Sequence, residues 1–145
     1  MIQIISGTKG SGKSKQLIDI ANEALAKESG FVVFIDDDKR YMYDLHRDIR
    51  FVDASEYPSG YKCSAHEFLG FLCGMLSSNY DLSLIAVDAF KKLVKTDMFS
   101  DEMRDFFEQV DRLSERHGCN FVFSISSLKE DVPEFIAKYL PKKQQ

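Results

Sequence analysis

The sequence predicts an α/β fold, a three-layer sandwich in which a mostly parallel five-stranded sheet has helices on both faces. Short apolar runs alternate along the chain with segments of helical periodicity, which is the pattern of strands joined by crossover helices. Some of these runs are apolar without interruption, as are strands that are covered on both faces. No repeat, low-complexity tract or Pro/Gly/Ser-rich linker divides the 145 residues, so we expect one domain over 1–145.

The expected elements follow from apolar periodicity and from turn residues. The first strand covers Ile2–Ser6, and apolar residues at helical spacing from Leu17 to Leu25 predict a helix that stops by Gly30. Further strands are expected at 31–35, 50–54, 82–88 and 121–125, and further helices at 64–77, 101–117 and 132–139. The apolar helix at 64–77 is expected to pack on the sheet, with a partner-docking surface as the alternative.

The composition indicates a protein of the cytoplasm and gives no sign of a nucleic-acid or membrane partner. The 19 basic and 23 acidic residues are mixed along the chain, and the net charge of -4 provides no broad basic surface. The N-terminus lacks the features of a secretory signal, and no apolar run approaches the roughly 20 residues of a membrane helix. The three cysteines, Cys63, Cys73 and Cys119, suit reduced thiols.

A phosphate-binding motif lies between the first strand and the first helix. The sequence from Gly7 to Ser14, Gly-Thr-Lys-Gly-Ser-Gly-Lys-Ser, has glycine, four residues, glycine, lysine and serine in the order that this motif requires. The glycines let successive N–H groups converge on a phosphate at the start of a helix. Lys13 is expected to reach the β and γ phosphates, and the Ser14 hydroxyl to bind Mg²⁺. The expected nucleotide-binding residues are Gly7, Thr8, Lys9, Gly10, Ser11, Gly12, Lys13, Ser14 and Lys15.

Asp88 is the second candidate metal residue. It follows the apolar run Leu84-Ile85-Ala86-Val87, at the carboxyl end of an expected strand, where open α/β sheets bind their ligands. Mg²⁺ keeps several waters and takes few carboxylates, so we expect Asp88 to orient the metal shell through water. A capping or loop aspartate is the alternative interpretation.

The phosphate-binding motif and Asp88 resemble the two signatures of the P-loop NTPase superfamily, and more narrowly of its RecA-like branch. That branch has a strand inserted between the two strands that carry the signatures. The chain also looks like short stand-alone bacterial ATP-binding P-loop proteins, some labelled as twitching-motility ATPase-like. The resemblance covers nearly the whole chain and implies binding of ATP with Mg²⁺.

The residue after Asp88 departs from the superfamily pattern. Many P-loop ATPases have a glutamate there to activate water, whereas this chain has Ala89. Slow hydrolysis is one explanation. The other is a base from the acidic cluster after the second strand, where such ATPases also carry acidic groups. We therefore take Asp36, Asp37 and Asp38 with Lys13 as the catalytic candidates, and a solvated acidic loop as the alternative.

Further polar residues are weaker candidates. Ser124, Ser126 and Ser127 end the last strand or follow it, where many P-loop ATPases have a residue that senses the γ-phosphate; we place Ser126 in the nucleotide site, with an ordinary turn as the alternative. Arginines that could stabilise a transition state are present, but their spacing selects none of them. These arginines are Arg40, Arg47 and Arg104.

These residues predict Mg-dependent binding of a nucleoside triphosphate, with slow hydrolysis driving a conformational switch. ATP is favoured because a guanine-reading Asn-Lys-x-Asp motif is absent from the sequence. A nucleotide-binding module without turnover, which engages a protein partner or a second copy of the chain, explains Ala89 equally well. A nucleoside kinase is a third possibility, since Gly10 to Ser14 followed by Leu17-Ile18 is similar to thymidine-kinase-like proteins, although their Asp-Glu pair and paired zinc cysteines are missing.

Overall fold

A five-stranded sheet forms the centre of the protein. The computed structural model describes residues 1–27 and 30–141. The strands are β1 (Ile2–Ser6), β2 (Phe31–Asp36), β3 (Arg50–Asp53), β4 (Leu82–Val87) and β5 (Asn120–Ile125). Their order across the sheet is β1-β5-β4-β2-β3, and each of these neighbouring pairs is parallel.

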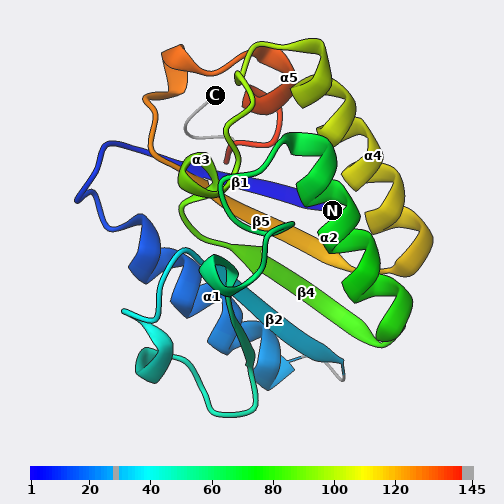
Figure 1. Cartoon of the computed structure of the whole chain (residues 1–145). Coiled ribbons are helices and arrows are strands. Elements are labelled where there is room, and N and C mark those ends of the chain that lie inside the picture. Colours follow the sequence, from blue (N-terminus) through cyan, green and yellow to red (C-terminus); the bar gives the residue numbers. More distant parts are fainter. Residues whose placement is uncertain (28–29, 142–145) are drawn as a thin grey trace.

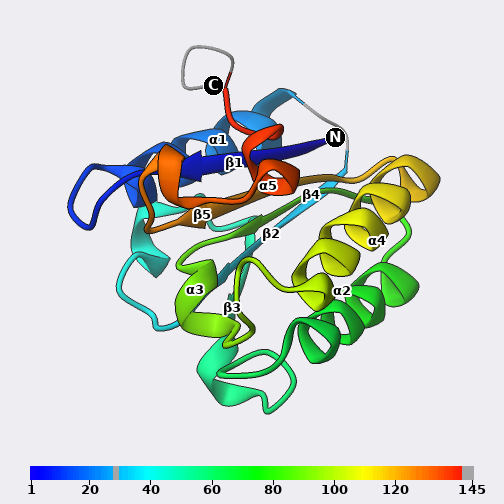
Figure 2. The same ribbon diagram turned by 90° about the horizontal axis from the view of Figure 1, so that it is seen from above.

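Helices cover both faces of this sheet and give the three layers that the sequence predicts. They are α1 (Lys13–Lys27), α2 (Ala65–Ser78), the short α3 (Phe90–Leu93), α4 (Asp101–His117) and the short α5 (Glu134–Ala137). Figures 1 and 2 show α1 on one face of the sheet and α2 and α4 side by side on the other. Three 3₁₀ turns, η1 (Met42–Asp44), η2 (Ala54–Glu56) and η3 (Lys129–Asp131), lie in the connections.

The strands β2, β4 and β5 are apolar on both faces because a helical layer covers each face of the sheet. In β2, Val32 and Phe34 belong to the core beneath α1, whereas Val33 and Ile35 belong to the core beneath α2 and α4. Successive side chains of a strand point to opposite faces, so an uninterrupted apolar run fills both cores at once. The same alternation is present in β4 and β5.

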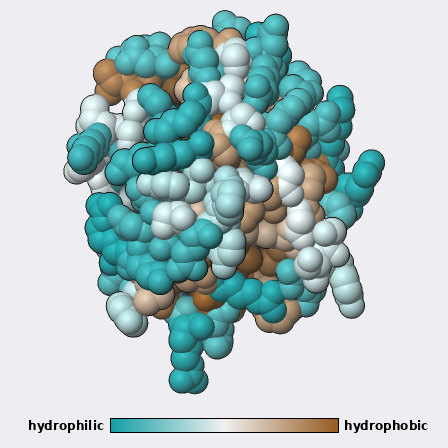
Figure 3. Space-filling model, in the orientation of Figure 1, coloured by the Kyte–Doolittle hydropathy of each residue, from teal (hydrophilic) through white to brown (hydrophobic). Residues whose placement is uncertain are grey.

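The helix α2 packs on the sheet, as expected. Its Ala65, Phe68, Leu72 and Leu76 are buried in the core that it shares with α4. Its other side forms part of a shallow groove. The groove is lined by Ser59, Glu67, Gly70, Phe71, Gly74, Met75, Ser78 and Asn79. Hydrophilic residues cover most of the face seen in Figure 3, and apolar residues show between them in limited areas.

The long helices begin and end at residues with clear capping roles. Ser64 precedes α2, and its hydroxyl accepts from the Glu67 N–H at 3.1 Å while Glu67 accepts from the Ser64 N–H at 2.9 Å, which is a capping box. The α4 helix matches the predicted range 101–117 and stops at Gly118, whose φ of 64° is the left-handed conformation that suits glycine.

The last predicted helix, 132–139, is wrong in length. Val132 and Pro133 are extended, and α5 covers Glu134–Ala137 alone. The chain then turns so that the Tyr139 carbonyl accepts from the Ile4 N–H at 2.9 Å. The helix gives way to tighter turns after Ala137, in which the Tyr139 and Leu140 N–H groups donate to carbonyls three residues earlier.

Other boundaries move by one or two residues. Strands β3 and β4 end one residue before the predicted limits, β5 begins one residue earlier, and α2 covers 65–78. Part of the first helix prediction, at 28–29, lies outside the described residues, as do 142–145 of the predicted domain. The cysteines are present as thiols, with Cys63 and Cys119 buried. None of the described helices has the length and apolar character that crossing a membrane requires.

Candidate functional site

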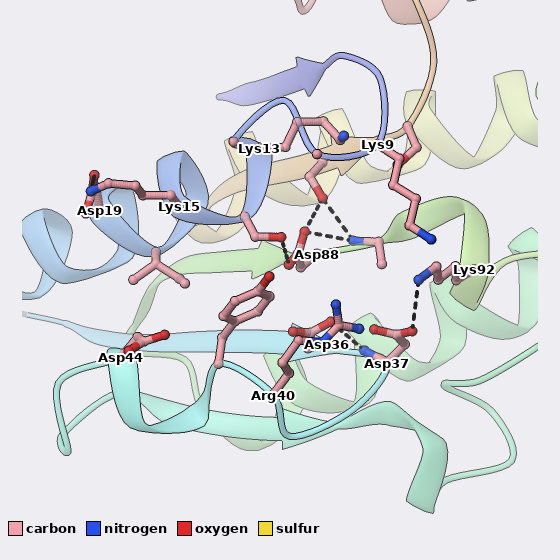
Figure 4. A pocket seen from close by; sticks show the side chains of 18 of the residues that line it. Lys9, Lys13, Lys15, Asp19, Asp36, Asp37, Arg40, Asp44, Asp88 and Lys92 are labelled. Carbon is pink, nitrogen blue, oxygen red and sulfur yellow. Dashed lines mark hydrogen bonds and ion pairs between the residues drawn. The ribbon is translucent and has the colours of Figure 1, made fainter.

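A cavity of about 860 Å³ opens at the carboxyl ends of the strands, between the start of α1 and the segments that follow β2 and β4. Its size is typical of small-molecule sites. The lining residues are Lys9, Gly10, Gly12, Lys13, Ser14, Lys15, Ile18, Asp19, Asn22, Asp36, Asp37, Arg40, Tyr41, Asp44, Asp88, Ala89, Lys91, Lys92, Ser124 and Ser126. The cavity thus combines several cationic side chains with buried carboxyl groups (Figure 4).

The loop 7–12 connects β1 to α1 in a conformation that requires glycine. Gly10 and Gly12 have φ values of 83° and 89°, a region that residues with a Cβ rarely adopt. The Ser11 N–H donates to the Thr8 carbonyl at 3.1 Å and closes a turn, and α1 begins at Lys13. The first N–H groups of a helix have no acceptor inside it, so this end of the cavity attracts an anion.

The side chain of Lys13, the first residue of α1, folds back against this loop. Its side chain is only 8% exposed, and its Nζ donates to the Thr8 carbonyl at 2.8 Å. Burial lowers the pKa of the Lys13 ammonium, and the nearby Asp88 opposes that shift. A desolvated ammonium held by one neutral carbonyl is ready to exchange this contact for a phosphate oxygen, because hydrogen bonds between charged groups are stronger.

Ser14 and Asp88 meet across the site, although 74 residues separate them in the sequence. The Ser14 Oγ donates to Asp88 Oδ2 at 2.8 Å, where the first turn of α1 approaches the residue that follows β4 (Figure 4). Asp88 is 4% exposed. The two residues that the sequence analysis assigned to a metal ion are therefore neighbours in the cavity.

The second oxygen of Asp88 faces the end of β5. Asp88 Oδ1 accepts a short hydrogen bond from the Ser124 hydroxyl and another from the Ala89 N–H at 3.0 Å. The Ala89 N–H also points at Ser124 Oγ, 2.9 Å away. Ala89 adopts the left-handed conformation with φ 55°, which is uncommon for alanine.

Asp36 is the most buried carboxyl group of the cavity, with 2% exposure. Its Oδ1 accepts from the Asp37 N–H at 2.7 Å, whereas its Oδ2 is buried and has no hydrogen-bond partner. Burial raises the pKa of Asp36 to about 8, and the Asp37 and Asp88 carboxyl groups add to this effect. Burial therefore favours the protonated form of the Asp36 carboxyl at neutral pH.

The three carboxyl groups of the predicted acidic cluster lie close together but have different surroundings. Asp37 lines the cavity, and its carboxylate lies 3.8 Å from the Lys92 ammonium. Asp38 is not among the lining residues, because its side chain turns to Arg40 in an ion pair of 2.9 Å that lowers the Asp38 pKa. One oxygen from each of Asp36, Asp37 and Asp38 lies within 4.8 Å of the others, but only Asp36 lacks a cationic partner for its buried oxygen.

The other predicted residues divide between the cavity and its surroundings. Lys9, Gly10, Gly12, Lys15 and Ser126 line the cavity. Gly7, Thr8 and Ser11 shape the loop behind it and are not lining residues. Of the three arginines that the spacing could not rank, only Arg40 lines the cavity.

Sequence reasoning missed a group of lining residues at the end of the cavity away from the phosphate loop. Ile18 and Asn22 follow Ser14 at four-residue steps and so share its face of α1, a signal that was available. The Asn22 amide donates to the Asp44 carbonyl at 3.2 Å and accepts from the His46 N–H at 2.8 Å, which fixes the segment after β2 against α1. Tyr41 and Asp44 of that segment follow no recognisable pattern. Lys91 and Lys92, on the short helix after Asp88, were also missed.

The oxygen donors of the cavity fit a magnesium ion. Ser14 supplies a hydroxyl and Asp88 a carboxylate, both hard ligands of the kind that Mg²⁺ prefers. Asp36 adds a buried carboxyl oxygen without a partner. Such a set leaves most of the metal shell to water and to phosphate oxygens, as is usual for Mg²⁺.

No model of a known protein family matches the chain, and no curated protein sequence matches it. The fold itself is an α/β three-layer architecture with a parallel five-stranded sheet. Its strand β5 lies between β1, which precedes the phosphate-binding motif, and β4, which precedes Asp88.

Proposed function

We propose that the protein binds a nucleoside triphosphate, ATP, together with Mg²⁺ in this cavity, as a P-loop NTPase of the RecA-like type. Slow hydrolysis and release of the phosphate would then change the conformation of the segments after β2 and β4. The observation that carries the proposal is the 2.8 Å contact between Ser14 and Asp88 beside Lys13. A glycine-rich turn without a ligand has no need to bring these particular groups together.

The residues around the phosphates have separate roles in this proposal. The N–H groups of the loop and of the first turn of α1 bind the β-phosphate, and Lys13 leaves the Thr8 carbonyl to contact the β and γ phosphates. Ser14 would hold the magnesium ion directly, and Asp88 would orient its water shell. The ion supplies charge neutralisation for the phosphates when it is bound.

Asp36 is the best candidate among the three acidic residues for a base that accepts a proton from water. It lines the cavity, it is buried, and its Oδ2 is not engaged in another contact. A pKa of about 8 leaves only a minority of this carboxyl ionised at neutral pH. This protonation supports slow turnover, as does the alanine at position 89.

A nucleotide-binding module without turnover is the second candidate function. Ala89 favours it, because the residue that follows Asp88 contributes a backbone N–H and no side-chain base to the cavity. In that case binding alone would order the segments after Asp36 and Asp88, and a protein partner would read the change.

Calorimetric titration of Mg-ATP and Mg-GTP tests the proposal, followed by measurement of phosphate release on the same samples. The parent protein should bind ATP, and Lys13→Ala should weaken binding by about 10- to 100-fold through loss of a charged contact. Lys27→Ala, at the exposed end of the same helix, is the matched control and should bind like the parent.

The outcomes separate the two candidate functions. Binding with phosphate release supports the ATPase, and binding without release supports the module. Preference for GTP would show that the nucleobase is guanine and not adenine. Equal binding by the parent and Lys13→Ala, or no binding of either nucleotide, would overturn the proposal.

A further inference from the structure

Ser124 occupies a buried position beside Asp88. Strands β4 and β5 are parallel neighbours in which Val87 pairs with Phe123, so the next residues, Asp88 and Ser124, lie side by side at the same edge of the sheet. Ser124 is 1% exposed and lines the cavity. The sequence analysis considered this serine only as a γ-phosphate sensor or a turn residue.

The Ser124 hydroxyl makes two hydrogen bonds, one as donor and one as acceptor, and the methyl group of an alanine could make neither. It donates to Asp88 Oδ1 and accepts from the Ala89 N–H at 2.9 Å. The Ala89 N–H reaches Asp88 Oδ1 as well, at 3.0 Å. Asp88 Oδ1 is thus engaged by two donors, and Oδ2 remains directed at Ser14.

We propose that Ser124 is a positioning residue for the metal site: it fixes the Asp88 carboxylate so that a single oxygen, Oδ2, faces Ser14 and the shell of the ion. This inference rests on the proposed nucleotide function, and it adds a residue that fixes the orientation of the Asp88 carboxylate at the metal site. Removal of a group that orients the surroundings of a metal ion through a hydrogen bond typically lowers metal affinity by about 10- to 100-fold.

The fixed carboxylate also determines which ion is preferred. Mg²⁺ requires a near-ideal octahedral shell and takes few carboxylate oxygens, whereas Ca²⁺ accepts a carboxylate through both oxygens in flexible geometry. With Oδ1 engaged by Ser124 and Ala89, Asp88 presents one oxygen, Oδ2, to the water shell of the ion in a fixed direction. Without the Ser124 hydroxyl, the Ala89 N–H alone holds Oδ1 and the direction of Oδ2 is less fixed, which harms the strict octahedral shell of Mg²⁺ more than the flexible shell of Ca²⁺.

The experiment measures ATP binding by the parent and by Ser124→Ala at a series of Mg²⁺ concentrations, and again with Ca²⁺. In Ser124→Ala the Mg²⁺ concentration at half-saturation should rise by about 10-fold or more, and that for Ca²⁺ should change less. ATP binding in EDTA should be unchanged, because the phosphate loop is intact. Ser124→Thr keeps the hydroxyl and should restore the Mg²⁺ dependence.

A matched control separates this role from the loss of any buried serine. Ser114 is 2% exposed, donates to the Cys119 carbonyl at 2.6 Å and lies on α4 outside the cavity. Ser114→Ala should lower the unfolding temperature and leave both metal dependences unchanged. If Ser124→Ala is unfolded at the assay temperature, Ser124→Cys keeps most of the volume with a weak donor and should show the same preferential loss of Mg²⁺ response.

The result that overturns the inference differs from the one that overturns the proposed function. If the parent binds Mg-ATP and folded Ser124→Ala or Ser124→Cys has the parent's Mg²⁺ dependence, Ser124 does not position Asp88, and the nucleotide function stands. An equal loss of Mg²⁺ and Ca²⁺ response, or a loss of ATP binding in EDTA as well, also overturns the positioning role. Failure of the parent to bind any nucleotide overturns both.

Discussion

Asp36 ends β2 and Asp88 follows the neighbouring parallel strand β4, and both residues are buried at the same edge of the sheet. Ile35 pairs with Val87, and the Asp88 N–H donates to the Ile35 carbonyl at 2.8 Å. Asp88 has two hydroxyl donors and one N–H donor, whereas Asp36 has one N–H donor and a buried oxygen without a partner. Together with burial, this proximity raises the pKa of Asp36 to about 8.

Phosphate release should therefore increase with pH if Asp36 is the base. The reactive carboxylate form of Asp36 in the free protein becomes more abundant as pH rises toward 8, so kcat/KM for Mg-ATP should rise about 10-fold per pH unit below that value and level off above it. Initial rates at Mg-ATP concentrations well below KM, between about pH 6 and 9.5, give this profile.

Substitutions assign this profile to one residue of the acidic cluster. Asp36→Asn should abolish the rise with pH and leave a low constant rate. Asp38→Asn should keep the rise, because Asp38 does not line the cavity and its carboxylate is paired with Arg40. A profile that is flat in the parent, or that survives in Asp36→Asn, contradicts the role of Asp36.

The stability of the unliganded protein should also depend on pH through Asp36. Its folded pKa lies above the ordinary value of 3.8, so the folded state binds more protons than the unfolded state between about pH 4 and 8. The stabilisation by the protonated form is full below about pH 4 and is lost as pH rises through 8.

Asp36→Asn copies the protonated carboxyl and removes this dependence. The variant should match the parent near pH 4 and exceed it by about 1–3 kcal/mol at pH 8.5, since each unit of pKa shift corresponds to about 1.4 kcal/mol and the open cavity reduces the effect. Urea unfolding in EDTA at the two pH values measures the difference. A constant gap between the two proteins, or a lower stability of Asp36→Asn at pH 8.5, would contradict the assignment.

Local patterns predicted most of the sheet and the glycine-containing turn between β1 and α1. Both faces of β2 and β4 are covered, so their apolar runs are continuous, and the α4 range follows from periodicity between Ser100 and Gly118. The last helix was predicted too long because Val132 and Pro133 are extended and the N–H groups of Tyr139 and Leu140 close tighter turns after Ala137, which the spacing of apolar residues does not distinguish from an α-helix.

The site was harder to predict, since its contacts join separate strand ends. Ser14 and Asp88 each carry a local signature, but their pairing, the role of Ser124 and the difference among the three aspartates depend on which strands are neighbours. Periodicity does not fix strand order. The residues that follow β2 in a connection of irregular structure, such as Tyr41, have no pattern from which their place could be predicted.

The contact between Ser14 and Asp88 should act as one unit in metal-dependent binding. Ser14→Ala and Asp88→Asn should each raise the Mg²⁺ concentration needed for ATP binding by about 10-fold or more, as for other groups at a metal site. In the double variant this Mg²⁺ concentration should be little higher than in the more impaired of the two single variants, because each substitution removes the same contact. A double-mutant cycle on the Mg²⁺ dependence measures this coupling, and strictly additive losses would show that the two residues act independently.

Asn22 should control the order of the segment that closes the far end of the cavity. Its amide makes two hydrogen bonds to that segment, to the Asp44 carbonyl at 3.2 Å and from the His46 N–H at 2.8 Å. Asn22→Ala removes both, and the cost should be about 1–2 kcal/mol. Hydrogen exchange over 42–48 should become faster in the variant, while Glu23→Ala, at the next and exposed position of α1, should leave it unchanged. Mg-ATP should protect the same amides if the nucleotide orders this segment, and unchanged exchange in Asn22→Ala would show that other contacts hold it against α1.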